Sequence, residues 1–133
     1  MNRKLLVSAL GLPVAAAIVL AGGSPAMASG GGGLTAKGSC SASTDWKLDV
    51  KKDDGRLEVE YEVDSNKRGQ TWTVLITDNG NQVFAGDKVT KRPTGSFRVH
   101  EWTDDLAGTD VFDATATNAA SDETCTGTLI LKK

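Results

Sequence analysis

The sequence contains few of the residues that most often carry chemistry: its 133 residues include one histidine and two cysteines. A catalytic triad, or a zinc site made of several histidines or thiolates, therefore has too few members. Basic residues are not in excess either, since 15 lysines and arginines stand against 17 aspartates and glutamates, which argues against a nucleic-acid-binding protein. With three prolines, 39% hydrophobic and 24% charged residues, we expect a single globular domain rather than a disordered chain.

A long hydrophobic run occurs at the beginning of the chain. Arg3 and Lys4 precede an uncharged, mostly apolar stretch over residues 5–21, and Ala-Met-Ala at 26–28 fits the pattern cut by signal peptidase. We therefore expect residues 1–28 to be a secretory signal peptide that is cut before Ser29; the alternative is that it is kept as a membrane anchor. The first interpretation predicts a secreted, extracellular protein that is free of the membrane once the signal is removed.

The part of the chain after the predicted cleavage point is mildly acidic. Loss of residues 1–28 removes Arg3 and Lys4, which leaves 13 basic and 17 acidic residues and a net charge of −4. Such a charge gives no attraction toward nucleic acid or anionic lipid. Residues 29–35 are rich in glycine and are expected to form a flexible lead, so the folded domain is expected over residues 36–133.

The two cysteines are expected to form one disulfide. Cys40 and Cys125 lie near the two ends of the predicted domain, and paired cysteines are usual in small extracellular domains. The bond would close a loop of about 85 residues, for which loop-closure entropy predicts a stabilisation of roughly 4 kcal/mol. The alternative, a redox or metal role, finds no second type of ligand nearby, because the chain has a single histidine.

From Asp45 onward, hydrophobic and polar residues alternate with the period of two that is typical of half-buried strands. Two such runs flank Asp54-Gly55, which favours a hairpin with a two-residue turn. The resulting register pairs Trp46, Leu48 and Val50 with Val63, Tyr61 and Val59, and Lys47 and Lys51 with Glu62 and Glu58. Apolar pairs on one face and opposite charges on the other support this register, since a slip by one residue would destroy both.

A second hairpin is predicted around Asn79-Gly80, with strands over residues 71–78 and 81–86. Continuing the register from the turn pairs Ile76 with Val83 on the core side and Leu75 with Phe84 on the solvent side. Ile130 in the last predicted strand points the same way. We therefore name Leu75, Phe84 and Ile130 as a candidate binding patch; the alternative is a register slip that buries Leu75 and Phe84.

The residue pattern in the rest of the chain also predicts strands and no helix. Short strands are expected over 88–91, 96–102, 110–118 and 123–131. Seven or eight short strands in one domain predict an all-β fold, an antiparallel β-sandwich.

One stretch resembles a known family. Residues 108–118 resemble strand F of immunoglobulin-like domains, with Phe112 where that strand has its corner tyrosine and Ala114 where it has a cysteine. Trp72 is similar to the buried tryptophan of strand C. The resemblance implies an immunoglobulin-like sandwich whose first and last strands run side by side and are joined by the Cys40–Cys125 bond. The whole sequence also resembles small secreted actinobacterial proteins, and neither likeness implies an activity.

Each candidate catalytic or metal-binding group in the sequence also has a structural explanation, and the structural explanation is the favoured one. His100 is expected on an outward face, opposite the glutamates of the 57–63 strand, with Ser96 about 13 Å away and out of reach. Glu58, Glu60 and Glu62 read as a solvated charge ladder. Fragments that look like calcium loops, at residues 53–55 and 78–81, are where the hairpins need turns. We therefore expect no catalytic residues, no metal site and no cofactor.

The remaining candidate is Trp102, which ends its predicted strand as either a binding anchor or a lid on the core; the lid is the favoured interpretation.

Together these features predict a secreted, non-catalytic binding or adhesion module whose partner is an extracellular protein, a glycan or a cell-envelope component. The alternative is a small-molecule carrier, for which the neocarzinostatin-type apoproteins offer a likeness in size and fold, or a secreted inhibitor. The inhibitor would use the Lys91-Arg92-Pro93-Thr94 turn.

Overall fold

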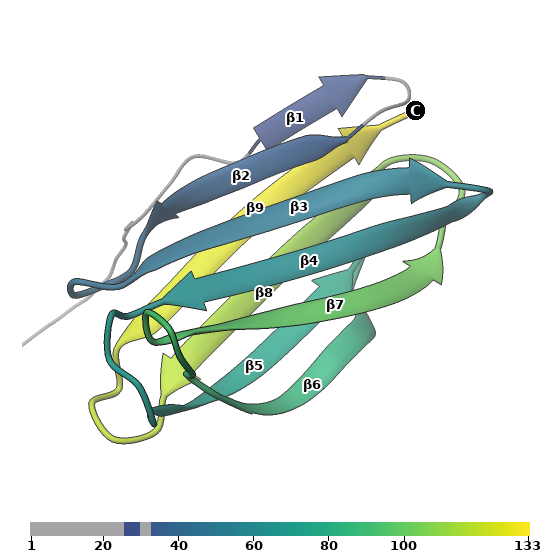
Figure 1. Cartoon of the computed structure of the whole chain (residues 1–133). Coiled ribbons are helices and arrows are strands. Elements are labelled where there is room, and N and C mark those ends of the chain that lie inside the picture. Colours follow the sequence, from purple (N-terminus) through teal and green to yellow (C-terminus); the bar gives the residue numbers. More distant parts are fainter. Residues whose placement is uncertain (1–25, 30–32) are drawn as a thin grey trace, which may run out of the picture.

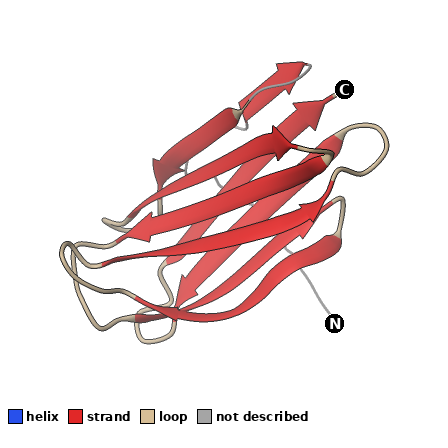
Figure 2. Ribbon diagram, turned by 45° about the vertical axis from the view of Figure 1, so that its right-hand side comes forward, coloured by secondary structure: helices blue, strands red, loops and turns tan. Residues whose placement is uncertain are grey.

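The computed structural model describes residues 26–29 and 33–133, and in these ranges the protein is an all-β sandwich of two sheets (Figure 1). One sheet has the order β1-β9-β8-β5-β6 and the other β2-β3-β4-β7. The strands are β1 (Ala26–Ser29), β2 (Leu34–Ser39), β3 (Asp45–Asp53), β4 (Arg56–Asp64), β5 (Thr71–Asp78), β6 (Asn81–Val89), β7 (Ser96–Asp104), β8 (Asp110–Asn118) and β9 (Thr124–Lys132). The two layers are connected by loops at both ends (Figure 2).

The predicted signal peptide lies outside the described residues except at its end. Strand β1 spans the predicted cleavage point before Ser29 and pairs in parallel with β9, from Ala26 opposite Leu129 to Ser29 opposite Lys132. Strand β2 begins at Leu34, two residues before the predicted start of the domain. In the described part of the chain there is no helix that has the length and apolar character needed to span a membrane.

The first predicted hairpin is confirmed in turn and in register. Asp54 and Gly55 have positive φ values of 56° and 76°, as a two-residue turn of this type requires. The pairs Val50–Val59, Leu48–Tyr61 and Trp46–Val63 face the core, while the Lys–Glu pairs face outward. The same alternation continues into β7, whose Val99 pairs with Tyr61.

The second hairpin corrects the predicted register. Asn79 and Gly80 form the turn, and Asp78 pairs with Asn81 as expected, but the register shifts between Ile76 and Thr77. Beyond this β-bulge, Ile76 pairs with Phe84 and Leu75 pairs with Ala85. Phe84 therefore turns toward the core side, where it packs against the buried cluster, instead of lying beside Leu75.

Strand β6 is also longer than predicted. It runs without a break to Val89, so residues 88–91 do not form a strand of their own. Lys91 contributes only an isolated bridge to Ser96.

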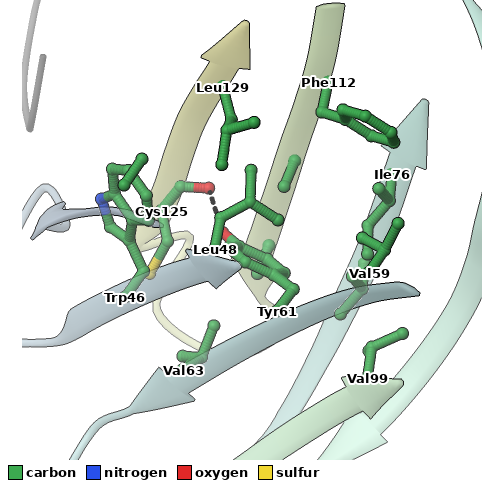
Figure 3. Packing of buried hydrophobic residues seen from close by; sticks show 14 of the residues in the cluster. Trp46, Leu48, Val59, Tyr61, Val63, Ile76, Val99, Phe112, Cys125 and Leu129 are labelled. Atoms are coloured by element: carbon green, nitrogen blue, oxygen red, sulfur yellow. Dashed lines mark hydrogen bonds between the residues drawn. The ribbon is translucent and has the colours of Figure 1, made fainter. Parts of the chain in front are cut away.

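The core lies between the two sheets and is filled with side chains from both (Figure 3). The largest fully buried side chains are Trp72, Tyr61 and Phe112. Tyr61 donates a hydrogen bond of 3.1 Å from its hydroxyl to the carbonyl of Cys125, which ties β4 to β9 across the sandwich (Figure 3). Burial raises the pKa of the Tyr61 phenol well above its usual range, so it stays a neutral donor.

The predicted disulfide is confirmed and connects the first and last strands of the expected domain, but these strands are not neighbours in one sheet. Cys40 follows the end of β2 and is bonded to Cys125 in β9, with 4.3 Å between their Cα atoms. Strands β2 and β9 belong to opposite sheets, so the bond crosses from one sheet to the other instead of joining neighbours within a sheet. A disulfide of this kind fits an oxidising environment.

The strand order is compatible with an immunoglobulin-like sandwich. Strands β9, β8, β5 and β6 follow one another as G, F, C and C′ do in that fold, and β7, β4 and β3 follow as E, B and A. Trp72 on β5 and Phe112 on β8 are fully buried, as the resemblance implies.

Candidate functional site

A hollow on the described surface lies between β6 and β7, an edge strand of each sheet. Its volume is about 430 Å³, and we call it the β6–β7 groove. Its two apolar lining residues are the buried Phe97 and the exposed Val89. The rest of the lining is polar or charged and consists of Glu62, Asp87, Lys88, Lys91, Arg92, Ser96 and Arg98. Polar and charged groups that converge on a hollow can fix the orientation of a bound ligand.

The rim of this groove carries an excess of positive charge. Arg98 is paired with Glu62, with 3.7 Å between guanidinium and carboxylate, and the Asp87 carboxylate accepts a hydrogen bond from Thr73. Among the described residues, Lys88, Lys91 and Arg92 have no ion-pair partner. The groove is therefore a basic site on a protein whose total charge is −2.

The loop that borders the groove is exposed but held in place. Lys91, Arg92, Pro93 and Thr94 are exposed, whereas Gly95 is buried with a φ of +89°. A Cβ added at Gly95 would lie 2.3 Å from the backbone nitrogen of Lys67, so the loop packs tightly against the β4–β5 connection. The amide of Ser65 donates to the Gly95 carbonyl at 3.0 Å. The four exposed side chains thus stand on a fixed base.

The structure does not bring the predicted Leu75, Phe84 and Ile130 patch together. Leu75 is 46% exposed on the outer face of its sheet, but Phe84 is half-buried on the inner face. Ile130 does lie outward, half-buried and opposite Val111 on β8. Strand β8 separates β5, which carries Leu75, from β9, which carries Ile130, so these two residues are not neighbours in the register either.

Trp102 does not cover the core, which corrects the favoured interpretation. It pairs with Glu58 on the outer face of the β2-β3-β4-β7 sheet and is 39% exposed. The guanidinium of Arg56 lies 4.9 Å from the centre of its indole ring, a cation–π contact. Asp53 and Asp54 complete a shallow hollow around these two side chains.

Beside Trp102, His100 faces the glutamates of β4, as the sequence predicts. Its register partner is Glu60, its Nε2 lies 2.5 Å from Oε2 of Glu58, and the imidazole and indole ring centres are 6.0 Å apart. One donor atom from each of Glu58, Glu60 and His100 falls within 4.8 Å of the others. Among the described residues, this is the group of side chains whose geometry could hold a metal ion.

Sequence reasoning missed a group of buried carboxylates at the opposite end of the five-stranded sheet from the disulfide. Asp78 and Asp110 are almost completely buried, and Lys133 lies 2.9 Å from Asp110 and 2.7 Å from Asp105. Burial, and then the neighbouring Asp110, raise the pKa of the Asp78 carboxyl to about 7, while Lys133 lowers the pKa of Asp105. The signal in the sequence was that three aspartates lie at strand ends or in a loop. The topology of the fold then brings these three residues together.

Comparison with known proteins adds no assignment: the chain matches no family model and no curated protein sequence.

Proposed function

We propose that this protein is a secreted, non-catalytic binding or adhesion module that binds an acidic component of the cell envelope through the β6–β7 groove. The observation that carries the proposal is the groove itself, whose lining combines Phe97 and Val89 with three basic side chains that lack ion-pair partners in the described structure. A ligand that presents carboxylate or phosphate groups along an extended chain would satisfy both features.

The position of the groove supports an extended ligand. Both β6 and β7 are edge strands, so each presents backbone groups that are not paired within its own sheet. A linear ligand can lie along such an edge while its charged groups contact Lys88, Lys91 and Arg92. The disulfide supports the extracellular part of the proposal, because such bonds persist in oxidising compartments.

Co-sedimentation of the purified protein with cell envelopes tests this function. The charge-reversal variant Lys91→Glu/Arg92→Glu should lose pelleting, since both side chains are exposed on the groove rim. The matched control Lys37→Glu/Lys132→Glu changes the charge by the same amount at exposed positions outside the groove and should pellet like the wild type. Equal retention by both variants, or no pelleting of the wild type, would contradict the proposal.

A secreted inhibitor is the second candidate, and the fixed loop before Gly95 favours it. Inhibitory loops need exposed residues on a rigid base, and Lys91 and Arg92 have both properties. Inhibition of a protease that prefers basic residues, lost in Lys91→Ala/Arg92→Ala, would support this candidate. The third class, a small-molecule carrier, is disfavoured because the groove lining is mostly charged.

A further inference from the structure

The outer face of the β2-β3-β4-β7 sheet carries a group of donor atoms that the binding function does not use. His100 is the single histidine of the chain. Its Nε2 lies 2.5 Å from Glu58 Oε2 and 3.9 Å from Glu60 Oε2. We propose that Glu58, Glu60 and His100 form a binding site for a divalent transition-metal ion of the Zn²⁺ and Cu²⁺ type.

The three ligands stand on rigid, adjacent strands. Glu58 and Glu60 are two residues apart on β4, an inner strand of the sheet, and therefore share its outer face. His100 is directly opposite Glu60 on β7. Directly opposed residues hold their Cβ atoms about 5 Å apart, so the backbone places the donors before an ion arrives.

Lysines balance the negative charges around the site only in part. Asp49 on β3 pairs with Glu60 on its other side, which brings a third carboxylate to the same row. Lys47 and Lys51 contact Asp49 and Glu58 at 3.7 Å and 3.9 Å, both from exposed positions. Within residues 33–133, Glu60 has His100 as its ion-pair contact and no lysine or arginine. A cation placed between these three side chains would neutralise this excess of negative charge.

The donor set selects the class of ion. One imidazole nitrogen and two carboxylate oxygens suit Zn²⁺ and Cu²⁺, with Cu²⁺ the tighter, and water would complete the coordination shell. Calcium and magnesium prefer a shell made entirely of oxygen atoms. Metal–ligand distances near 2.0–2.2 Å need Glu58 to exchange its hydrogen bond with His100 for a bond to the metal. The side chains of Glu58 and His100 are 20% and 43% exposed, which leaves room for that rotation.

Titration calorimetry with Zn²⁺ alone tests the site, on protein without a histidine tag. We expect one ion per chain, and we expect His100→Ala and Glu60→Gln each to weaken binding by more than about tenfold. Glu62→Gln is the matched control, because Glu62 shares the strand and the outer face but is paired with Arg98. Absence of binding by the wild type, or binding that survives in His100→Ala, would overturn the proposal. So would equal binding of Ca²⁺.

Trp102 supplies a second readout, since its ring centre is 6.0 Å from that of His100. Cu²⁺ should quench the fluorescence of the wild type, and Trp102→Phe should remove most of that change because Trp46 and Trp72 are buried in the core. Quenching that is unchanged in His100→Ala would contradict the site. The groove variant Lys91→Glu/Arg92→Glu should keep its metal affinity, so failure of the metal site and failure of envelope binding are separate outcomes.

Discussion

At Gly127 the two sheets approach each other closely. A Cβ at this position would lie 2.4 Å from an atom of the Trp46 ring, which comes from the opposite sheet. Trp46 is 3% exposed and is enclosed by the core, so its ring cannot move away without cost. We expect Gly127→Ala to lower the free energy of unfolding by about 1–3 kcal/mol through overpacking.

Urea unfolding measures this effect, with Thr126→Ala as the control. Thr126 is the exposed neighbour on the same strand and should change stability by less than about 0.5 kcal/mol. A Gly127→Ala protein as stable as the wild type would show that the Trp46 ring can be displaced freely.

Asp78 makes the stability of the protein depend on pH. Its pKa in the folded state is about 7, against an ordinary value of 3.8, because of burial and the adjacent Asp110. The folded state thus holds this proton more tightly than the unfolded state does. The corresponding stability is fully present below about pH 4 and is lost as the pH rises toward about 7.

The free energy of unfolding of Asp78→Asn should therefore decrease less between about pH 4 and pH 7 than that of the wild type. Urea unfolding at a series of pH values measures the slope, and Asp45→Asn, at an exposed position, serves as the control. Parallel slopes for the wild type and Asp78→Asn would contradict the assignment.

At the scale of single elements, the bulge in the β5–β6 hairpin decides which apolar side chains are exposed. Phe84 lies over Gly86 on the core side, with 3.3 Å between its ring and the position of a Cβ at Gly86, whereas Leu75 points to solvent. We expect Phe84→Asp to destabilise the protein by at least about 2 kcal/mol and Leu75→Asp to change stability by less than about 0.5 kcal/mol. Equal losses in chemical denaturation of the two variants would mean that the straight register is the correct one.

The contrast between the two hairpins shows what alternation in a sequence can determine. In β3 and β4, apolar pairs on one face and Lys–Glu pairs on the other support a single register. In β6, Val83 and Phe84 are adjacent and both apolar, so alternation does not say which of them faces inward. The turn fixes only the pairs next to it, and the extra residue of a bulge leaves no signal of its own.

The candidate sites were predictable to different degrees for the same reason. His100 opposite the glutamates followed from alternation within each strand together with the expected neighbours. The β6–β7 groove depends on how two edge strands from different sheets approach each other, which no local pattern encodes. The burial of Asp78 beside Asp110 likewise depends on the packing of loops far apart in the chain.

At the scale of the whole molecule, the disulfide fastens the two sheets to each other. Cys40 and Cys125 are 85 residues apart in the sequence, and the chain between them contains strands from both sheets. Removing the bond in Cys40→Ala/Cys125→Ala should lower the free energy of unfolding by roughly 4 kcal/mol, chiefly because the unfolded chain regains freedom. Guanidinium denaturation of the variant and of the oxidised and reduced wild type measures the loss. Equal stability of all three would show that packing alone holds the sheets together.

Cleavage at the predicted site would change the edge of the five-stranded sheet at strand β1. The cut before Ser29 falls inside this strand and would remove three of its four residues from the edge of β9. In the uncut chain this segment covers the backbone edge of β9 at Leu129–Lys132. Proteolysis would then turn a closed sheet edge into an acceptor for a new strand. Amide exchange along β9, slow in the uncut chain and faster after the cut, would follow that conversion directly.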